Sequence, residues 1–162
     1  RVLFRSFVMN AIDIKERLSD KTRPVFAIGV AADLVGVSVH TLRMYETAGL
    51  IIPQRTKSKR RLYSQSDIER LQCIRVMIED RGFNLAGIKG MMSMAPCWEI
   101  KGCSEADRAS CDAYKSSLEP CWMVKSTTSA CQDEECSECP VYREVTTCHN
   151  MKSYLQEHWK NA

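Results

Sequence analysis

The chain has 162 residues, of which 44% are hydrophobic and 27% are charged, and its formal net charge is +3. This length supplies one ordinary hydrophobic core, or one small core with a satellite that is held together in another way. No stretch approaches the roughly 18 consecutive apolar residues that a membrane helix needs, so we expect no membrane partner and a cytoplasmic location.

The net charge conceals a division between the two halves of the chain. Residues 1–94 carry 16 Lys and Arg against 9 Asp and Glu, whereas residues 95–162 carry 7 against 11. A basic segment is typical of proteins that bind nucleic acid, because neutralising phosphates releases counterions. A solvated basic face is the alternative on charge alone. With the patterns below, the division predicts an N-terminal extension (1–24), a DNA-binding domain (25–94), a cysteine-rich module (95–149) and a C-terminal helix (150–162).

Two short helices are predicted at the start of the basic domain. Apolar residues recur at helical spacing from Val30 to Val35, and Gly36 is a stop signal. Ser38 is a candidate N-cap of a second helix, which Gly49 closes. Two short helices joined by a turn form a helix-turn-helix, in which the second helix enters the major groove of DNA.

A basic hairpin, or wing, is predicted after Pro53. Cations on such a loop can reach phosphates, and an ordinary solvated hairpin is the alternative. A third helix follows with Ser64 or Ser66 as its cap, and "NLAGIKGMMSM" predicts a fourth that Pro96 stops. The cations of the hairpin are Arg55, Lys57, Lys59, Arg60 and Arg61.

The phrases "TLRMYE", "RRLYS" and "NLAGIK", in this order, resemble the winged helix-turn-helix domain of the MerR family of transcription regulators. The wording is most similar to the heat-shock-repressor (HspR-like) branch, and the resemblance covers about residues 25–93. It implies a mainly α fold and a double-stranded promoter DNA partner that is palindromic. It also implies a homodimer, and RNA polymerase is a further candidate partner.

The resemblance also implies which side chains face DNA. His40, Thr41 and Arg43 would lie on the recognition helix, and Tyr45 would contact or support a phosphate. Arg43 agrees with the chemistry, because a long donor early in this helix suits guanine edges or phosphates. The wing would add Arg60 and Arg61, with Lys57 and Lys59 contributing charge and Tyr63 serving either as a DNA contact or as wing core. Val35, Leu42 and Leu50 are assigned to the hydrophobic core.

The sequence departs from the family after the fourth helix. Many members continue into one long helix that forms an antiparallel coiled coil with the partner subunit, but here Pro96 stops the chain and the cysteines begin. The dimer contact is therefore expected elsewhere, in the cysteine-rich module, in "IDIKERL" or in the terminal "MKSYLQEHWK".

The cysteine-rich module contains an internal repeat. "PCW" at residues 96–98 recurs at residues 120–122. Likewise, the pattern of two cysteines eight positions apart, with a tyrosine three positions later, occurs at residues 103–114 and again at residues 131–142. The repeat pairs three cysteines per copy and leaves Cys136 and Cys148, so the module holds two sets of four thiols. It resembles a two-CW module, a cysteine-rich segment appended to regulatory proteins.

Four thiolates around one centre suit iron–sulfur clusters and tetrahedral zinc alike, since both take soft ligands. The candidate metal ligands are Cys97, Cys103, Cys111, Cys121, Cys131, Cys136, Cys139 and Cys148. An iron–sulfur cluster that senses redox state or metal is the favoured hypothesis, although the sequence lacks the C-x2-C-x-C-x5-C spacing of SoxR-type redox sensors. Zinc is the alternative, and a thiol–disulfide switch is the third.

Neighbouring aromatic and thiol residues receive structural assignments. Trp98 and Trp122 are expected to pack over the sulfurs and form a small apolar core. Cys73 is expected to be a small buried residue of the third helix. His149 is more simply a solvated residue than a ligand. An enzyme, such as a small thiol oxidoreductase, is the competing class, but no phosphate loop or metalloprotease motif supports it, so we expect no enzyme.

Overall fold

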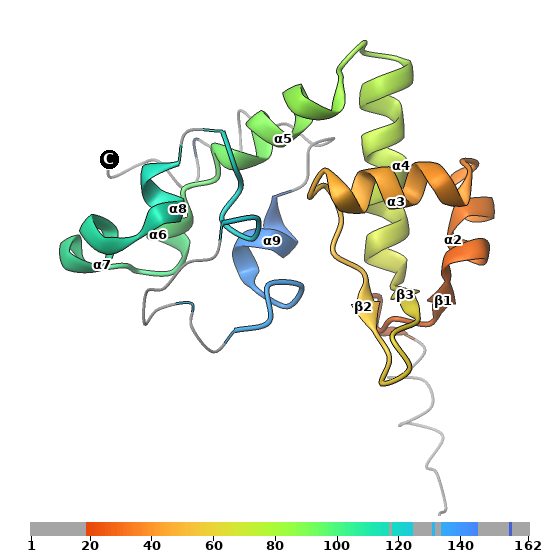
Figure 1. Cartoon of the computed structure of the whole chain (residues 1–162), viewed down its shortest axis with the longest axis horizontal. Coiled ribbons are helices and arrows are strands. Elements are labelled where there is room, and N and C mark those ends of the chain that lie inside the picture. Colours follow the sequence, from red (N-terminus) through yellow and green to blue (C-terminus); the bar gives the residue numbers. More distant parts are fainter. Residues whose placement is uncertain (1–18, 117, 125–130, 132–133, 146–155, 157–162) are drawn as a thin grey trace, which may run out of the picture.

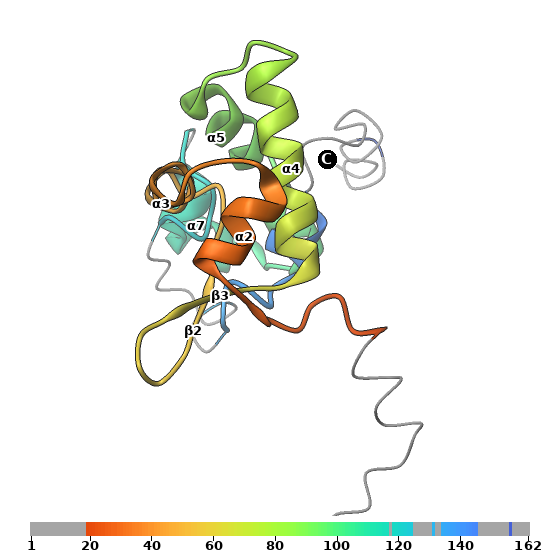
Figure 2. The ribbon, with the colours of Figure 1, turned by 90° about the vertical axis from the view of Figure 1, so that its right-hand side faces the viewer.

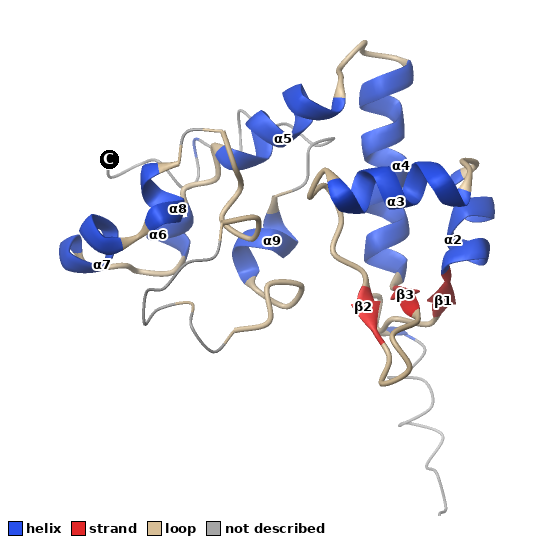
Figure 3. Ribbon diagram, in the orientation of Figure 1, coloured by secondary structure: helices blue, strands red, loops and turns tan. Residues whose placement is uncertain are grey.

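The computed structural model describes residues 19–116, 118–124, 131, 134–145 and 156. Helices dominate, and three short strands lie together at one end (Figure 3). No helix in these residues is long and apolar enough to cross a bilayer. The elements are β1 (Phe26–Ala27), α2 (Ile28–Val35), α3 (Val39–Thr47), β2 (Gln54–Arg55), β3 (Arg61–Tyr63), α4 (Gln65–Glu79), α5 (Leu85–Ser93), α6 (Cys97–Ile100), α7 (Glu105–Ser110), α8 (Asp112–Lys115) and α9 (Pro140–Glu144).

The predicted wing is present and belongs to a three-stranded antiparallel sheet in the order β1-β3-β2. Gln54 pairs with Leu62 across the hairpin, and Phe26 pairs with Tyr63 on the other side of β3. The sequence indicated only a short apolar stretch where β1 forms. A strand of two residues has no periodicity of its own, because its partner lies more than thirty positions further along the chain.

The predicted helix caps and stop signals are present in the structure. Gly36 ends α2 in the left-handed conformation with φ of 75°. The Ser38 side chain caps α3 by accepting a hydrogen bond from the Thr41 amide. Of the two serines offered for α4, Ser64 is the cap and forms a reciprocal capping box with Asp67. These signals fix where each helix begins and so where the recognition helix presents its side chains.

The core of the winged helix-turn-helix is built from all four of its helices (Figure 1). The predicted core residues Val35, Leu42 and Leu50 are buried, which confirms that assignment. Val30 and Leu34 are about half exposed, although the apolar periodicity had included them. The buried face of α2 is centred on its two alanines and Val35, so the neighbouring positions fall outside the contact with α4.

The cysteine-rich module lies beside the winged helix-turn-helix, with α9 between that domain and helices α6 to α8 (Figure 1). The module was predicted to be irregular, but it contains the short helices α6, α7, α8 and α9. Val141 of α9 and Val145 just after it are buried in the same hydrophobic cluster as Leu50 and Ile51. The module therefore draws on the core of the DNA-binding domain for part of its burial, which offsets its shortage of aliphatic residues.

Candidate nucleic-acid interface and thiol site

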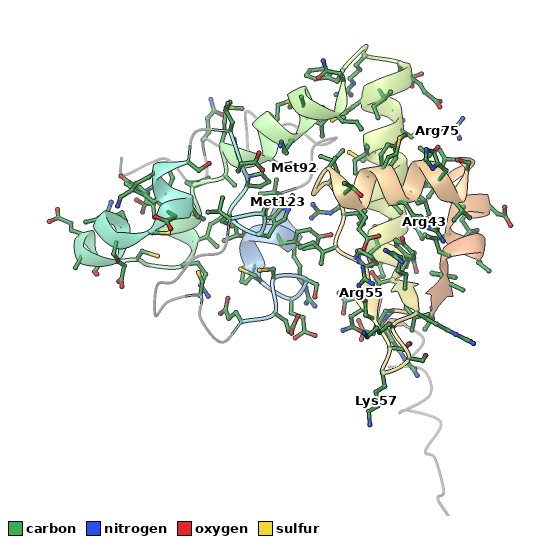
Figure 4. The ribbon with its side chains drawn as sticks, viewed as in Figure 1. Arg43, Arg55, Lys57, Arg75, Met92 and Met123 are labelled. Carbon is green, nitrogen blue, oxygen red and sulfur yellow. The ribbon has the colours of Figure 1, made fainter. Side chains whose placement is uncertain are left out.

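The recognition helix α3 exposes a polar face. His40 and Arg43 are exposed, and Figure 4 shows Arg43 on this helix. Thr41 is half-buried, and its hydroxyl lies 2.8 Å from the Ser38 hydroxyl at the start of the helix. The longer His40 and Arg43 side chains are thus available to a groove, whereas the Thr41 hydroxyl already takes part in the cap.

A carboxylate on the recognition helix holds the wing beside it. One oxygen of Glu46 accepts a hydrogen bond from Arg55 at 2.6 Å, and the other accepts one from the Nε of Arg61. The hydrogen bond that Arg61 donates to Glu46 also raises the pKa of Arg61. We call this three-residue arrangement the Glu46 clamp. It links the wing to α3 through two charge-assisted hydrogen bonds.

The hairpin between β2 and β3 projects from the body of the protein (Figure 2), and its tip carries cations. Lys57, Lys59 and Arg60 are exposed, and Figure 4 shows Lys57 directed away from the domain. Lys59 occupies the left-handed region with φ of 61° and closes the turn by donating its amide to the Thr56 carbonyl at 2.8 Å. Among the residues that the structure describes, these three cations form no ion pair.

The two halves of the cysteine-rich module share one local geometry. Trp98 packs edge-on against Tyr114 with ring centroids 5.2 Å apart and planes at 89°. Trp122 packs in the same way against Tyr142, at 5.2 Å and 86°. In each half, a cysteine caps the short helix that carries the tyrosine, namely α8 and α9. We call residues 96–116 the first unit and residues 120–145 the second unit.

Thiols from the two units meet. The thiols of Cys97 and Cys121 are hydrogen-bonded, which lowers the pKa of Cys97 and raises that of Cys121. Burial raises the pKa of Cys131 to about 11. The side chains of Lys101 and Glu134 pair across the units. Within the described residues, no group of three or more Cys, His, Asp or Glu side chains is arranged to hold a metal ion.

The second unit docks onto the segment that joins the recognition helix to the wing. The Trp122 indole donates a hydrogen bond to the Gly49 carbonyl at 2.7 Å. The Tyr142 hydroxyl accepts one from the Ile52 amide at 2.8 Å. Behind Tyr142, the Arg70 guanidinium of α4 lies 4.1 Å from the ring centroid and donates to the Tyr142 carbonyl.

Comparison with known proteins identifies a family and relatives for this domain. The family profile described as "MerR HTH family regulatory protein" matches residues 26–95. The chain is 45% identical over 71 residues to the heat shock protein HspR of Streptomyces coelicolor. It is 40% identical over 74 residues to the transcriptional regulator GlnR of Bacillus anthracis. These alignments cover 44% and 46% of this chain, and 47% and 57% of the relatives, so the chain spans about half their length.

A longer alignment extends beyond the winged helix-turn-helix. The heavy metal-dependent transcription regulator 1 of Rhizobium meliloti is 31% identical over 136 residues, which cover 77% of this chain and 90% of that relative. The chain belongs to the MerR family. The names of the family profile and of these relatives describe transcription regulators and not enzymes.

The predicted DNA contacts of this MerR-family domain differ in how far they are exposed. His40, Arg43, Lys57, Lys59 and Arg60 are exposed on the recognition helix and wing, where the sequence placed them. Thr41 and Arg61 are half-buried and already bonded within the domain. Arg61 is therefore better described as part of the Glu46 clamp than as a free phosphate contact.

Two of the predicted DNA contacts are tyrosines, and the structure places them differently. Tyr63 is fully buried, where burial raises its pKa to about 12. It is therefore wing core, which was one of its two predicted roles, and not a DNA contact. Tyr45 is 5% exposed and lies one turn from buried Leu42 on the inward face of α3. The resemblance implied that Tyr45 contacts or supports a phosphate; its burial favours the supporting role, which stays a prediction.

Most of the predicted thiol ligands lie in the part of the chain that the structure describes. Seven of the eight are described and come from both units: Cys97, Cys103, Cys111, Cys121, Cys131, Cys136 and Cys139. Cys148 and His149 lie outside the described residues, as do "IDIKERL" and, apart from helical Gln156, the predicted C-terminal helix. Cys73 is buried, as predicted, but is also disulfide-bonded, which its position in the sequence did not indicate.

The docking of the second unit was not predicted. Trp98 and Trp122 were expected to fill a small core near the sulfurs, and with Cys97 and Cys121 they line a small cavity of about 30 Å³. Only Trp122 of this pair has a hydrogen bond to the DNA-binding domain among the described residues. The repeat made the two tryptophans equivalent in sequence, so the sequence carried no signal for which one would dock.

Proposed function

We propose that this protein is a sequence-specific DNA-binding transcription regulator whose cysteine-rich module binds an iron–sulfur cluster and senses redox state or metal. The observation that carries the DNA-binding part is the exposed cationic face that the Glu46 clamp assembles from α3 and the wing. A recognition helix in the major groove with a wing on the flanking phosphates is the docking mode that this face supports. A palindromic promoter element and a homodimer follow from the same proposal.

The thiol site supports the sensing part of the proposal. Cys97 of the first unit contacts Cys121 of the second unit across the repeat. Thiolates suit a cluster or zinc, and either would supply the cross-link that a module with few aliphatic residues needs. Two relatives, the heavy metal-dependent regulator and the mercuric resistance operon regulatory protein of Bacillus cereus, bear names that favour metal responsiveness. Zinc and a thiol–disulfide switch remain the alternatives.

Anaerobic purification followed by absorption spectroscopy and metal analysis tests the cofactor. We expect broad visible bands that bleach with dithionite, together with iron and sulfide in equal amounts. A colourless protein that contains zinc would replace the cluster with the alternative metal. A metal-free protein whose thiol count falls on mild oxidation would leave the thiol–disulfide switch.

A further inference from the structure

The second unit contacts the segment that joins the recognition helix to the wing. Residues 48–53 connect the end of α3 with the start of β2. Within this segment, Trp122 bonds to Gly49 and Tyr142 bonds to Ile52. A shift of the second unit therefore acts on this segment at two points.

The same two aromatic residues are tied closely to thiols. Cys121 immediately precedes Trp122 in the chain, and Cys139 caps α9, which carries Tyr142. The two rings also contact each other edge to face, so they form one rigid pair. Any ligand that draws Cys121 and Cys139 into one coordination sphere must move or lock this pair.

The first unit has matching thiols and rings but a different location. Trp98 and Tyr114 form the equivalent pair, and Tyr114 is exposed. Within the described residues, neither side chain has a hydrogen bond to the recognition helix or the wing. One unit thus bonds to the segment between α3 and the wing, and within the described residues the other does not.

The second unit also borders a cavity on one side, which leaves space for it to shift. A cavity of about 490 Å³ is lined by residues of the second unit, Ser137, Glu138 and Arg143, and by Arg70 and Cys73 of α4. Close-packed interiors resist displacement, whereas an open side permits it. Val141 of α9 and Val145 just after it lie in the hydrophobic core, so this side of α9 is held in place.

We propose that Trp122 and Tyr142 are positioning residues that transmit the loading state of the second unit's thiols to the recognition helix and wing of the same chain. This inference rests on the proposed sensing function. It goes beyond that function by placing the coupling in one of the two repeats and inside one chain, without a dimer helix. The first unit contributes ligands to the site but does not set the DNA affinity.

Binding of DNA by loaded and metal-free full-length protein tests this inference. The probe is a duplex enriched by the wild-type protein from a randomised library, and the protein is reconstituted with Fe²⁺ and sulfide under anaerobic conditions. We expect the two dissociation constants of the wild type to differ by about 5- to 150-fold, the usual range of allosteric coupling. Trp122→Phe and Tyr142→Phe should bring this ratio close to 1 while iron content is unchanged. Trp98→Phe and Tyr114→Phe are matched controls that should keep the wild-type ratio.

The possible failures are distinguishable. A wild-type ratio of 1 would refute the sensing function itself, and the inference with it, before any variant is measured. A wild-type ratio above about fivefold that survives in both Trp122→Phe and Tyr142→Phe would overturn the inference alone. So would an equal loss in the first-unit controls, because the effect would then come from the module as a whole.

Hydrogen exchange of the metal-free protein tests the dock without metal or DNA. The Ile52 amide should exchange about fivefold faster in Tyr142→Phe than in the wild type, which corresponds to the loss of one hydrogen bond. Tyr114→Phe should leave this amide unchanged. Equal protection of Ile52 in the wild type and Tyr142→Phe would contradict the docking contact on which the inference depends.

Discussion

Glu46 decides which wing cations remain free for DNA. It occupies both Arg55 and Arg61, while Lys57 at the tip has no such partner in the described structure. The run "RTKSKRR" could not reveal this, because the cations look equivalent in sequence and Glu46 precedes them by nine or more positions. The family resemblance did place His40 and Arg43 on the outward face of the recognition helix, and both side chains are exposed.

Lys57→Ala and Arg61→Ala should differ in their effect on the salt dependence of DNA binding. Each phosphate contact contributes about 0.9 to the slope of log K against log salt concentration. Lys57→Ala should lower the slope by about this amount, whereas Arg61→Ala should lower it by clearly less because its charge is already neutralised by Glu46. Fluorescence anisotropy over a series of salt concentrations measures both. Equal losses of slope would show that Arg61 leaves the clamp to bind a phosphate.

At the scale of single elements, the same capping motif begins a long core helix in one part of the chain and a short exposed helix in the other. Ser64–Asp67 and Ser104–Asp107 are both reciprocal capping boxes. The first begins the 15-residue α4, which spans the core, and the second begins the exposed six-residue α7. Sequence identifies both caps equally well but not how much structure depends on each.

Ser64→Ala should therefore cost more stability than Ser104→Ala. Loss of a serine cap costs about 1 to 2 kcal/mol when the helix is integral to the fold. Ser104→Ala should cost less than about 0.5 kcal/mol, a normal value for a surface change. Urea denaturation followed by circular dichroism gives both values. A cost for Ser104→Ala as large as for Ser64→Ala would mean that α7 is part of the cooperative core.

The turn after the recognition helix provides a second comparison between matched elements. Gly49 and Gly82 both have positive φ, at 76° and 70°. A Cβ at Gly49 would lie 2.3 Å from the Met123 sulfur of the second unit, whereas at Gly82 it would meet open space. Figure 4 shows Met123 between the module and the DNA-binding domain.

Gly49→Ala should destabilise the protein more than Gly82→Ala. Both alanines meet the left-handed conformation, which costs about 1 kcal/mol, and only the first must also displace Met123. In a Met123→Ala background the difference between the two should vanish. Thermal unfolding of the four variants measures this. A difference that persists without Met123 would place the extra cost in the turn itself and not in the contact with the second unit.

At the scale of the whole molecule, the sequence predicted the parts better than their assembly. The helix-turn-helix, the wing and the duplicated cysteine unit follow from local patterns, and the two Trp–Tyr pairs confirm the repeat in three dimensions. That α9 enters the core of the DNA-binding domain could not be predicted, because Val141 and Val145 meet Leu50 and Ile51 across about ninety residues.

The central claim is that the state of the cysteine-rich module alters DNA affinity through contacts within one chain. The most direct test is the ratio of dissociation constants for one selected duplex, measured with reconstituted and metal-free wild-type protein at a single salt concentration. We predict a ratio of at least about fivefold. Two equal dissociation constants, with the metal content of the two samples confirmed to differ, would contradict the claim and leave the module as a structural appendage.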